Sequence, residues 1–241
     1  MSYRAQKMEL VFELGSLDVA DVARLIISVL GLEDEIIRLY GKPVNSVGIA
    51  ETIRGARRSA FSIETSKCSV HFATAAAYKL HLLEIREGAG CEMRLWDIIA
   101  DLFIGESGFV QAYVADDEYA YWQSAHDPVQ YEAAGRTISG LPMISNGLPA
   151  PLTRMVIDVS GNPSRRVLRV GFVEAIGHIL WLGPKFWAAV GERRQQEIFR
   201  LKICQATVLI KDVLRVQVLA GPFIDEKTRF EQEQLRGALF E

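Results

Sequence analysis

The sequence predicts an α+β fold, in which mixed or antiparallel strands form one or more sheets with flanking helices. Segments with strand-like alternation of apolar residues occur in groups, helical segments lie between the groups, and no regular strand–helix–strand rhythm runs along the chain. The chain has 241 residues, 49% of them hydrophobic and 24% charged, which is ample material for a buried core. We expect one domain over 1–241, or two subdomains that meet near 140–151.

The first third of the chain predicts one strand followed by helices. MELVFEL (8–14) alternates as a half-buried strand does. Ser16 followed by Asp18 and Asp21 is typical of a helix start, because acids are favourable in the first turn. The helices expected here cover 22–30, 32–41 and 48–58.

The middle of the chain predicts strands and a helix, followed by a second, shorter helix. The expected strands cover 69–73, 79–85 and 109–115, and the expected longer helix covers 94–103. The last strand leads directly into DDEYAYW (116–122). Asp116 is suited to cap a short helix there, because its carboxylate can accept a hydrogen bond from the first turn.

The run GLPMISNGLPAP (140–151) contains two glycines and three prolines, which do not allow one continuous element. It predicts a boundary or a long surface loop. Beyond it we expect strands over 153–159, 166–172, 205–210 and 213–219, the last two as a hairpin, and helices over 184–190, 193–201 and 225–240.

Composition narrows the class of protein. The three cysteines Cys68, Cys91 and Cys204 form an odd set without close pairing, which favours reduced thiols in the cytoplasm. The start of the chain lacks the apolar core of a secretory signal, and the apolar segments are too short to cross a bilayer. The net charge of −3 does not indicate a nucleic-acid or membrane partner. We therefore expect a cytoplasmic protein with neither partner.

No motif for a metal or a cofactor stands out. Cys68, His71, His81 and Cys91 supply zinc-binding side chains, but compact zinc sites bring two close pairs together and here the second pair is ten residues apart. GESGF (105–109) lacks the second glycine of a nucleophile elbow, and no phosphate-binding glycine loop follows any strand. We expect neither metal nor cofactor.

Two further patterns have a functional and an ordinary interpretation. Four acids could converge as magnesium ligands or as a general acid and base, but solvated helix faces carry such acids as well. They are Asp97, Asp101, Asp116 and Asp117. Two arginine clusters could contact phosphates, yet the first lies in a neutral third of the chain and the second alternates along a strand. They are Arg54, Arg57 and Arg58, and Arg165, Arg166 and Arg169.

The strongest signal is an acidic and aromatic segment. Residues 92–132 carry nine acids and one base, a net charge of −8, whereas 1–91 is neutral and 133–241 carries +5. The same 41 residues contain four of the seven tyrosines. Each ring could simply pack inward. Together, however, large rings that dominate interface energies and a clustered charge that steers a partner predict a binding face for a basic protein surface.

The segment VGFVEAIGHILWLGPKFWAAVG (170–191), followed by QATVLI and VLRVQVL, resembles the carboxy-terminal half of bacterial immunity proteins. These belong to polymorphic-toxin and type VI secretion systems, and the likeness is to the α+β family encoded beside toxins with a restriction-endonuclease-like nuclease domain. WLGPKFW is the most specific stretch and predicts structure: a turn at Gly183 and Pro184, with Trp181, Phe186 and Trp187 in a core.

The resemblance implies a protein without catalysis of its own, which binds a cognate toxin in the cytoplasm and occludes or distorts its active site. A nuclease presents a basic cleft to hold phosphates, so an acidic, aromatic-edged surface is suited to block it. The resembling region does not include 116–122, and the role of that segment is inferred from its residues alone.

The sequence thus predicts an immunity protein that neutralises a secreted toxin, with a nuclease as the expected partner. The expected contact residues are Asp116, Asp117, Glu118, Tyr119, Tyr121 and Trp122, with Asp97, Asp101 and Glu106 as steering charges. The alternatives are a carboxylate-dependent, metal-assisted enzyme and a regulatory module that binds a host protein.

Overall fold

The computed structural model describes residues 4–55, 59–88, 93 and 95–241, and it has the predicted α+β fold. The first half contains β1 (Gln6–Glu13), α1 (Val19–Val29), β2 (Ile37–Leu39), β3 (Lys42–Val44), α2 (Ile49–Gly55), β4 (Phe61–Glu64), β5 (Cys68–Ala75), β6 (Leu80–Glu87), α3 (Trp96–Phe103), β7 (Phe109–Asp116) and α4 (Asp117–Ser124). The second half contains α5 (Pro128–Ala133), β8 (Met143–Ser145), β9 (Met155–Ile157), β10 (Val167–Arg169), β11 (Phe172–Glu174), β12 (Ile179–Leu182), α6 (Pro184–Val190), α7 (Glu192–Arg200), β13 (Cys204–Val208), β14 (Leu214–Val218) and α8 (Arg229–Phe240).

One large antiparallel sheet organises the fold. Its ten strands follow the order β13-β14-β12-β7-β1-β6-β5-β4-β2-β3, so that the first strand of the chain lies in the interior of the sheet. β1 pairs with β6 on one side and with β7 on the other. On its other side β7 pairs with β12, and β12 pairs with the C-terminal strand β14. Two short hairpins, β8–β9 and β10–β11, lie outside this sheet.

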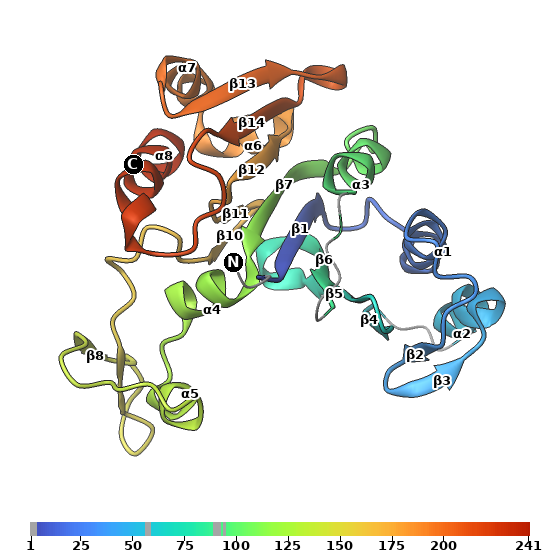
Figure 1. The fold of residues 1–241 in the computed structure, drawn as a ribbon, viewed down its shortest axis with the longest axis horizontal. Coiled ribbons are helices and arrows are strands. Elements are labelled where there is room, and N and C mark those ends of the chain that lie inside the picture. The colour runs from blue at the N-terminus through green and yellow to red at the C-terminus, as the bar shows by residue number, and fades with distance from the viewer. Residues whose placement is uncertain (1–3, 56–58, 89–92, 94) are drawn as a thin grey trace.

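The two faces of the sheet carry separate cores. On the first face, Met8, Leu10 and Phe12 of β1 pack with α1, α2 and α3. On the second face, Val11 belongs to a core that includes α6, α7 and α8. Successive residues of a strand point to opposite faces, which is why β1 contributes to both cores. Figure 1 shows α1 and α2 at one end of the molecule and α7 and α8 at the other.

The expected helix over 32–41 is wrong. Ile37 and Leu39 are buried and alternate with exposed Arg38, and they form β2, which pairs with β3 and β4. Tyr40 and Gly41 both have positive φ and make the tight turn into β3. A helical interpretation fitted the apolar spacing, but pairing across the sheet decides the structure of so short an apolar segment.

The expected strand over 166–172 is a hairpin instead. Gly171 has a φ of +86°, which L side chains rarely adopt, and it reverses the chain between β10 and β11. The predicted hairpin of the C-terminal strands is confirmed as β13–β14. The strand β12, which precedes this hairpin and ends at the first two residues of WLGPKFW, was not predicted as a strand, although its burial of Trp181 agrees with the expected core role.

Residues 140–151 are mostly exposed and contain β8, which pairs with β9. This hairpin and α5 share a small cluster of their own, built around Ala125, Tyr131 and Ile157. Figure 1 shows α5 and β8 lying away from the large sheet. Across the described ranges, no helix has both the length and the apolar character needed to span a bilayer.

Candidate functional site

Within the acidic and aromatic segment, the stretch DDEYAYW (116–122) forms the end of β7 and most of α4, as the sequence predicts. Asp116 has extended backbone and caps the helix by accepting a hydrogen bond from the Tyr119 N–H at 2.7 Å. Asp117 and Glu118 occupy the first turn, where negative charge is favourable toward the helix dipole. The Asp117 N–H donates to the Ala5 carbonyl at 3.0 Å, which ties the helix start to the chain just before β1.

Four of the predicted contact residues line one concavity, here called the α4 hollow. It has a volume of about 480 Å³ and is lined by Arg4, Ala5, Arg86, Asp116, Asp117, Glu118 and Tyr121. Three carboxylates and two guanidinium groups leave it with a formal charge of −1. The lining residues thus carry a small excess of negative charge, with Lys7 and Arg136 also close to their carboxylates, and Tyr121 forms one aromatic wall.

The three acids of the hollow differ in how far they face solvent. Asp116 is 2% exposed and forms an ion pair with Arg4 at 2.7 Å, so its carboxylate holds the structure together and is not a surface charge. Asp117 is partly buried and lies 3.6 Å from Lys7 and 3.7 Å from Arg86. Glu118 is 64% exposed, with Arg136 at 2.9 Å, and presents its charge to solvent.

The three rings of α4 also divide. Tyr119 packs against the second core, and its hydroxyl donates to Gln232 Oε1 at 3.2 Å; burial is the main reason its pKa is raised. Trp122 is partly buried against Tyr131, with ring centroids 4.8 Å apart, and carries Arg136 over its ring. Tyr121 is 43% exposed and is the ring of α4 that faces the hollow.

The remaining predicted residues lie elsewhere. Asp97 and Asp101 are on α3, which covers the first face, whereas α4 packs with the core of the second face. Glu106 precedes β7 and Asp116 ends it, so the two are separated by the length of an eight-residue strand. All three carboxylates are exposed, but they share no surface with the α4 hollow.

The four aspartates proposed to converge as metal ligands or as an acid–base pair do not do so. Asp97 pairs with Arg215 of β14 at 2.7 Å, and Asp116 pairs with Arg4 ahead of β1. β12 and β7 lie between β14 and β1 in the sheet. Neighbouring strands are about 4.8 Å apart, so these two aspartates are held at separate places.

The zinc and phosphate patterns are equally dispersed. His71 lies on the second face of β5 in the register position opposite Glu84, whereas Cys68 is buried in the first core. Cys91, Arg57 and Arg58 lie outside the described residues. Among the residues that the structure describes, no group of three or more His, Cys, Asp and Glu side chains is arranged to hold a metal ion.

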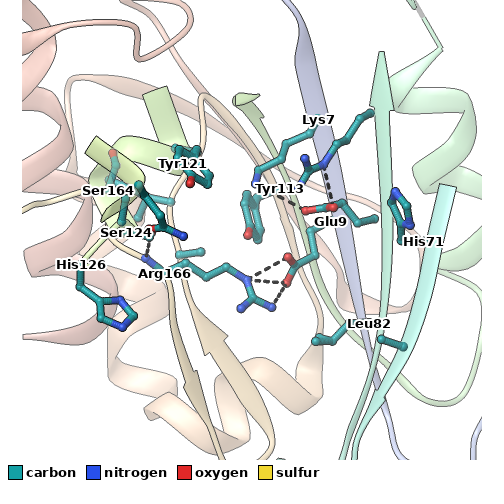
Figure 2. Close-up of a pocket in the computed structure, with 18 residues that line it drawn as sticks. Lys7, Glu9, His71, Leu82, Tyr113, Tyr121, Ser124, His126, Ser164 and Arg166 are labelled. Carbon is teal, nitrogen blue, oxygen red and sulfur yellow. Dashed lines mark hydrogen bonds and ion pairs between the residues drawn. The ribbon is translucent and has the colours of Figure 1, made fainter. Parts of the chain in front are cut away.

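A second concavity, which sequence reasoning missed, lies beside the α4 hollow. This sheet cavity has a volume of about 410 Å³ and shares Arg86 and Tyr121 with the hollow. Its floor is the second face of the sheet at β1, β5, β6 and β7, where the covering helices end. Figure 2 shows Tyr121 and His126 on one side of it and His71 on the opposite side.

A polar row crosses the floor of the sheet cavity. Tyr113 is the register partner of Glu9, Glu9 is the partner of Glu84, and Glu84 is the partner of His71, across four neighbouring strands. Two carboxylates placed directly opposite each other destabilise a sheet unless cations compensate them. The neighbouring row supplies two such cations, because Lys7 is the register partner of Arg86.

Glu9 is compensated by an arginine from a distant segment. Arg166 donates to both Glu9 carboxylate oxygens, with distances of 2.9 to 3.2 Å, and Glu9 is 3% exposed. Burial alone would lower the pKa of Arg166, but the carboxylate outweighs it and the pKa is raised. Tyr113 is buried beside this pair, and its burial together with the Glu9 charge raises the pKa of the phenol, which stays protonated.

Glu84 is compensated from its own sheet face. Arg86 Nε donates to it at 2.8 Å, and Lys7 Nζ lies at 3.4 Å. Burial alone would raise the pKa of Glu84, yet these two cations outweigh burial and lower it. The Glu84 carboxylate is thus held ionised.

One signal for this cavity was present in the sequence. In β1, Lys7, Glu9 and Val11 alternate with Met8 and Leu10. Lys7, Glu9 and Val11 therefore lie on the second face of the sheet. A solvent-facing set is the ordinary interpretation of such a pattern. Only the pairing of β1 between β6 and β7 shows that Lys7 and Glu9 are buried.

Comparison with known proteins gives little beyond the fold itself. No protein-family model matches the chain, and no curated protein matches it. Among solved structures, it is similar to a Pseudomonas aeruginosa T6SS protein, PA0821, with 14% sequence identity and a TM-score of 0.48 over 99% of this chain and 74% of that chain. At this distance the likeness carries no functional assignment, and the site must be interpreted from its own residues.

Proposed function

We propose that this protein is a cytoplasmic immunity protein, which binds and neutralises a secreted toxin, with a nuclease as the expected target. The observation that carries the proposal is the α4 hollow. Its exposed Glu118 and its half-exposed Tyr121 border one concavity. A basic side chain of a partner could enter the hollow, meet the carboxylates and lie against the ring.

The rest of the site supports a contact surface of fixed shape. The start of α4 is held by the Asp116 cap, by the Arg4 ion pair and by the backbone bond to Ala5. A surface that is ordered before binding loses little conformational entropy when the partner arrives. Glu118 and Tyr121 are therefore presented from a rigid helix.

The proposal predicts that a gene beside this one encodes a toxin domain, and that domain is the partner used in the test. Wild-type protein is expected to restore growth when the two are co-expressed and to co-purify with the toxin. Glu118→Lys reverses the most exposed charge of the hollow, and Tyr121→Ala removes its ring. Each is expected to weaken binding by about tenfold or more, because a central tyrosine and a steering charge dominate such interfaces.

Asp101→Lys is the matched control, since it makes the same charge reversal on the exposed side of α3, away from the hollow. It should leave affinity within about twofold, as expected for a charge outside the contact area. The proposal is wrong for this face if Glu118→Lys weakens binding no more than Asp101→Lys does in folded proteins.

A further inference from the structure

The sheet cavity has properties that the proposed toxin contact does not use. It is lined by three permanent cations, Lys7, Arg86 and Arg166, and by two carboxylates, Glu9 and Glu84. With its histidines neutral, these lining residues carry a formal charge of +1, and Asp117 of the adjoining α4 hollow, 3.6 Å from Lys7 and 3.7 Å from Arg86, offsets part of it. Arg86, whose side chain is 40% exposed, is the cation of this lining that a ligand can reach most easily, so the cavity is suited to a ligand with one negative charge, and a doubly charged anion would leave an uncompensated charge in a partly buried site.

Hydrogen-bond donors remain available to such a ligand. Within the described chain, Arg86 donates one side-chain hydrogen bond, from Nε to Glu84, and its Nη1 lies 3.7 Å from Asp117, beyond hydrogen-bond range. Arg86 is 40% exposed, so its Nη groups can turn toward a ligand. A guanidinium group offers two parallel N–H donors to a carboxylate, which fixes the orientation of the acid.

The remaining walls are largely apolar. The small apolar side chains that line the cavity are Ala73, Leu82, Ala120, Ala125, Ala175 and Ile176. A volume of about 410 Å³ lies within the range of small-molecule sites. Figure 2 shows the space between Tyr121, on α4, and Leu82, on the floor of the sheet.

From this geometry we infer that the sheet cavity binds a small organic acid with a single carboxylate and an apolar body. The carboxylate lies at Arg86 above the floor, beside Lys7, and the apolar body lies against Leu82 and the alanine walls. Binding is non-covalent and needs no metal or co-reactant. The site is distinct from the proposed toxin contact, although Arg86 and Tyr121 border both.

The chemistry is tested with three ring compounds of similar shape: benzoate, benzamide and benzylamine. Titration calorimetry should detect saturable binding of benzoate at millimolar concentrations, and ligand-induced NMR shifts should map to the residues that line the cavity. Benzamide and benzylamine should bind at least about tenfold more weakly, since a hydrogen bond to a charged group is worth about 1.5–3 kcal/mol. Equal binding of benzamide, or no binding of benzoate, overturns the inference.

Two variants locate the site. Ala73 is exposed on β5 at the cavity, so Ala73→Phe fills the space without burying a misfit, and it should abolish benzoate binding. Arg86→Gln should weaken benzoate binding about tenfold, for the loss of one charged donor. The matched control Arg38→Gln removes an exposed arginine of β2 and should leave benzoate binding unchanged. Unaltered binding to a folded Ala73→Phe protein shows that the cavity is not the site.

The result does not depend on the toxin. Ala73 is outside the α4 hollow, so Ala73→Phe should retain toxin binding while it loses benzoate binding. Failure of the toxin test therefore leaves the acid-binding inference standing, and failure of the benzoate test leaves the toxin proposal standing.

Discussion

The Glu9–Arg166 ion pair makes a quantitative prediction about stability. Glu9 is 3% exposed on an interior strand, and Arg166 reaches it through Nε and Nη2 from a segment 157 residues away. Arg166→Met removes both donors and leaves a buried carboxylate without its main partner. The loss of two charge-assisted hydrogen bonds, at about 1.5–3 kcal/mol each, should lower the free energy of unfolding by about 3–6 kcal/mol. The general cost of breaking a buried ion pair, about 3–5 kcal/mol, agrees with this estimate.

We expect Arg166→Met to lower the free energy of unfolding by about 4 kcal/mol, a large part of the roughly 5–15 kcal/mol typical of a folded protein. Urea unfolding monitored by circular dichroism measures it. In a Glu9→Gln background the same substitution should cost only about 1 kcal/mol, because no buried charge is left behind.

Arg169→Met is the matched control for that experiment. Arg169 pairs with Glu174 at 2.7 Å, but it is 52% exposed, so the loss of this pair should cost less than about 1 kcal/mol. The reasoning is refuted if Arg166→Met costs no more than Arg169→Met, or if its cost is the same with Glu9 and with Gln at position 9.

Three further predictions concern stability. Burial lowers the pKa of His178 to about 4, whereas the same histidine in the unfolded chain has a pKa of about 6.5. As pH falls from about 6.5 to 4, the unfolded chain therefore binds a proton that the folded chain does not, and about 3 kcal/mol of stability should be lost. Urea unfolding at several pH values should show this loss, and His178→Gln should reduce it. A Cβ on Gly177 would lie 2.1 Å from a β7 carbonyl oxygen, so Gly177→Ala should lower the unfolding free energy by about 2 kcal/mol or more, whereas Gly161→Ala, in open space, should be near neutral in thermal unfolding. Asp116→Ala removes the acceptor for both the Tyr119 N–H and Arg4 and should cost about 3 kcal/mol or more in urea, and Asp116→Asn, which keeps an acceptor for the cap but not the charge, should cost less; equal losses would argue against the cap.

Local signals predicted much of the fold. The Asp116 cap, the strand β1 and the turn at Gly183 depend on residues close in sequence, and each is found where the sequence places it. Two details differ: Asp18, expected in the first turn after Ser16, is itself the cap of α1, and β1, expected to be half-buried, is buried on both faces. The segment 32–41 fails because its apolar spacing fits either a helix or a strand, and only its pairing with β4 decides between them.

The candidate site was less predictable than the fold. The sequence identified the segment that forms α4, but it treated Asp116 and Tyr119 as surface groups, and both are held inside by partners far along the chain, Arg4 and Gln232. The sheet cavity depends on Arg166 meeting Glu9, a contact between segments that no local pattern connects. Composition locates charge along the chain, but it does not show which charges compensate one another.

The interior position of β1 has a consequence for how the protein forms in the cell. β1 comes before both of its neighbours in the chain, so it has no pairing partner until residues 80–87 and 109–116 have been made. Contacts between segments so distant in sequence are slow to form, and until then the Met8, Leu10 and Phe12 side chains have no finished core to enter. Until residue 116 has been made, the nascent chain therefore exposes an apolar strand, and a chaperone that covers β1 should raise the yield of native protein more than one that acts on α7 and α8.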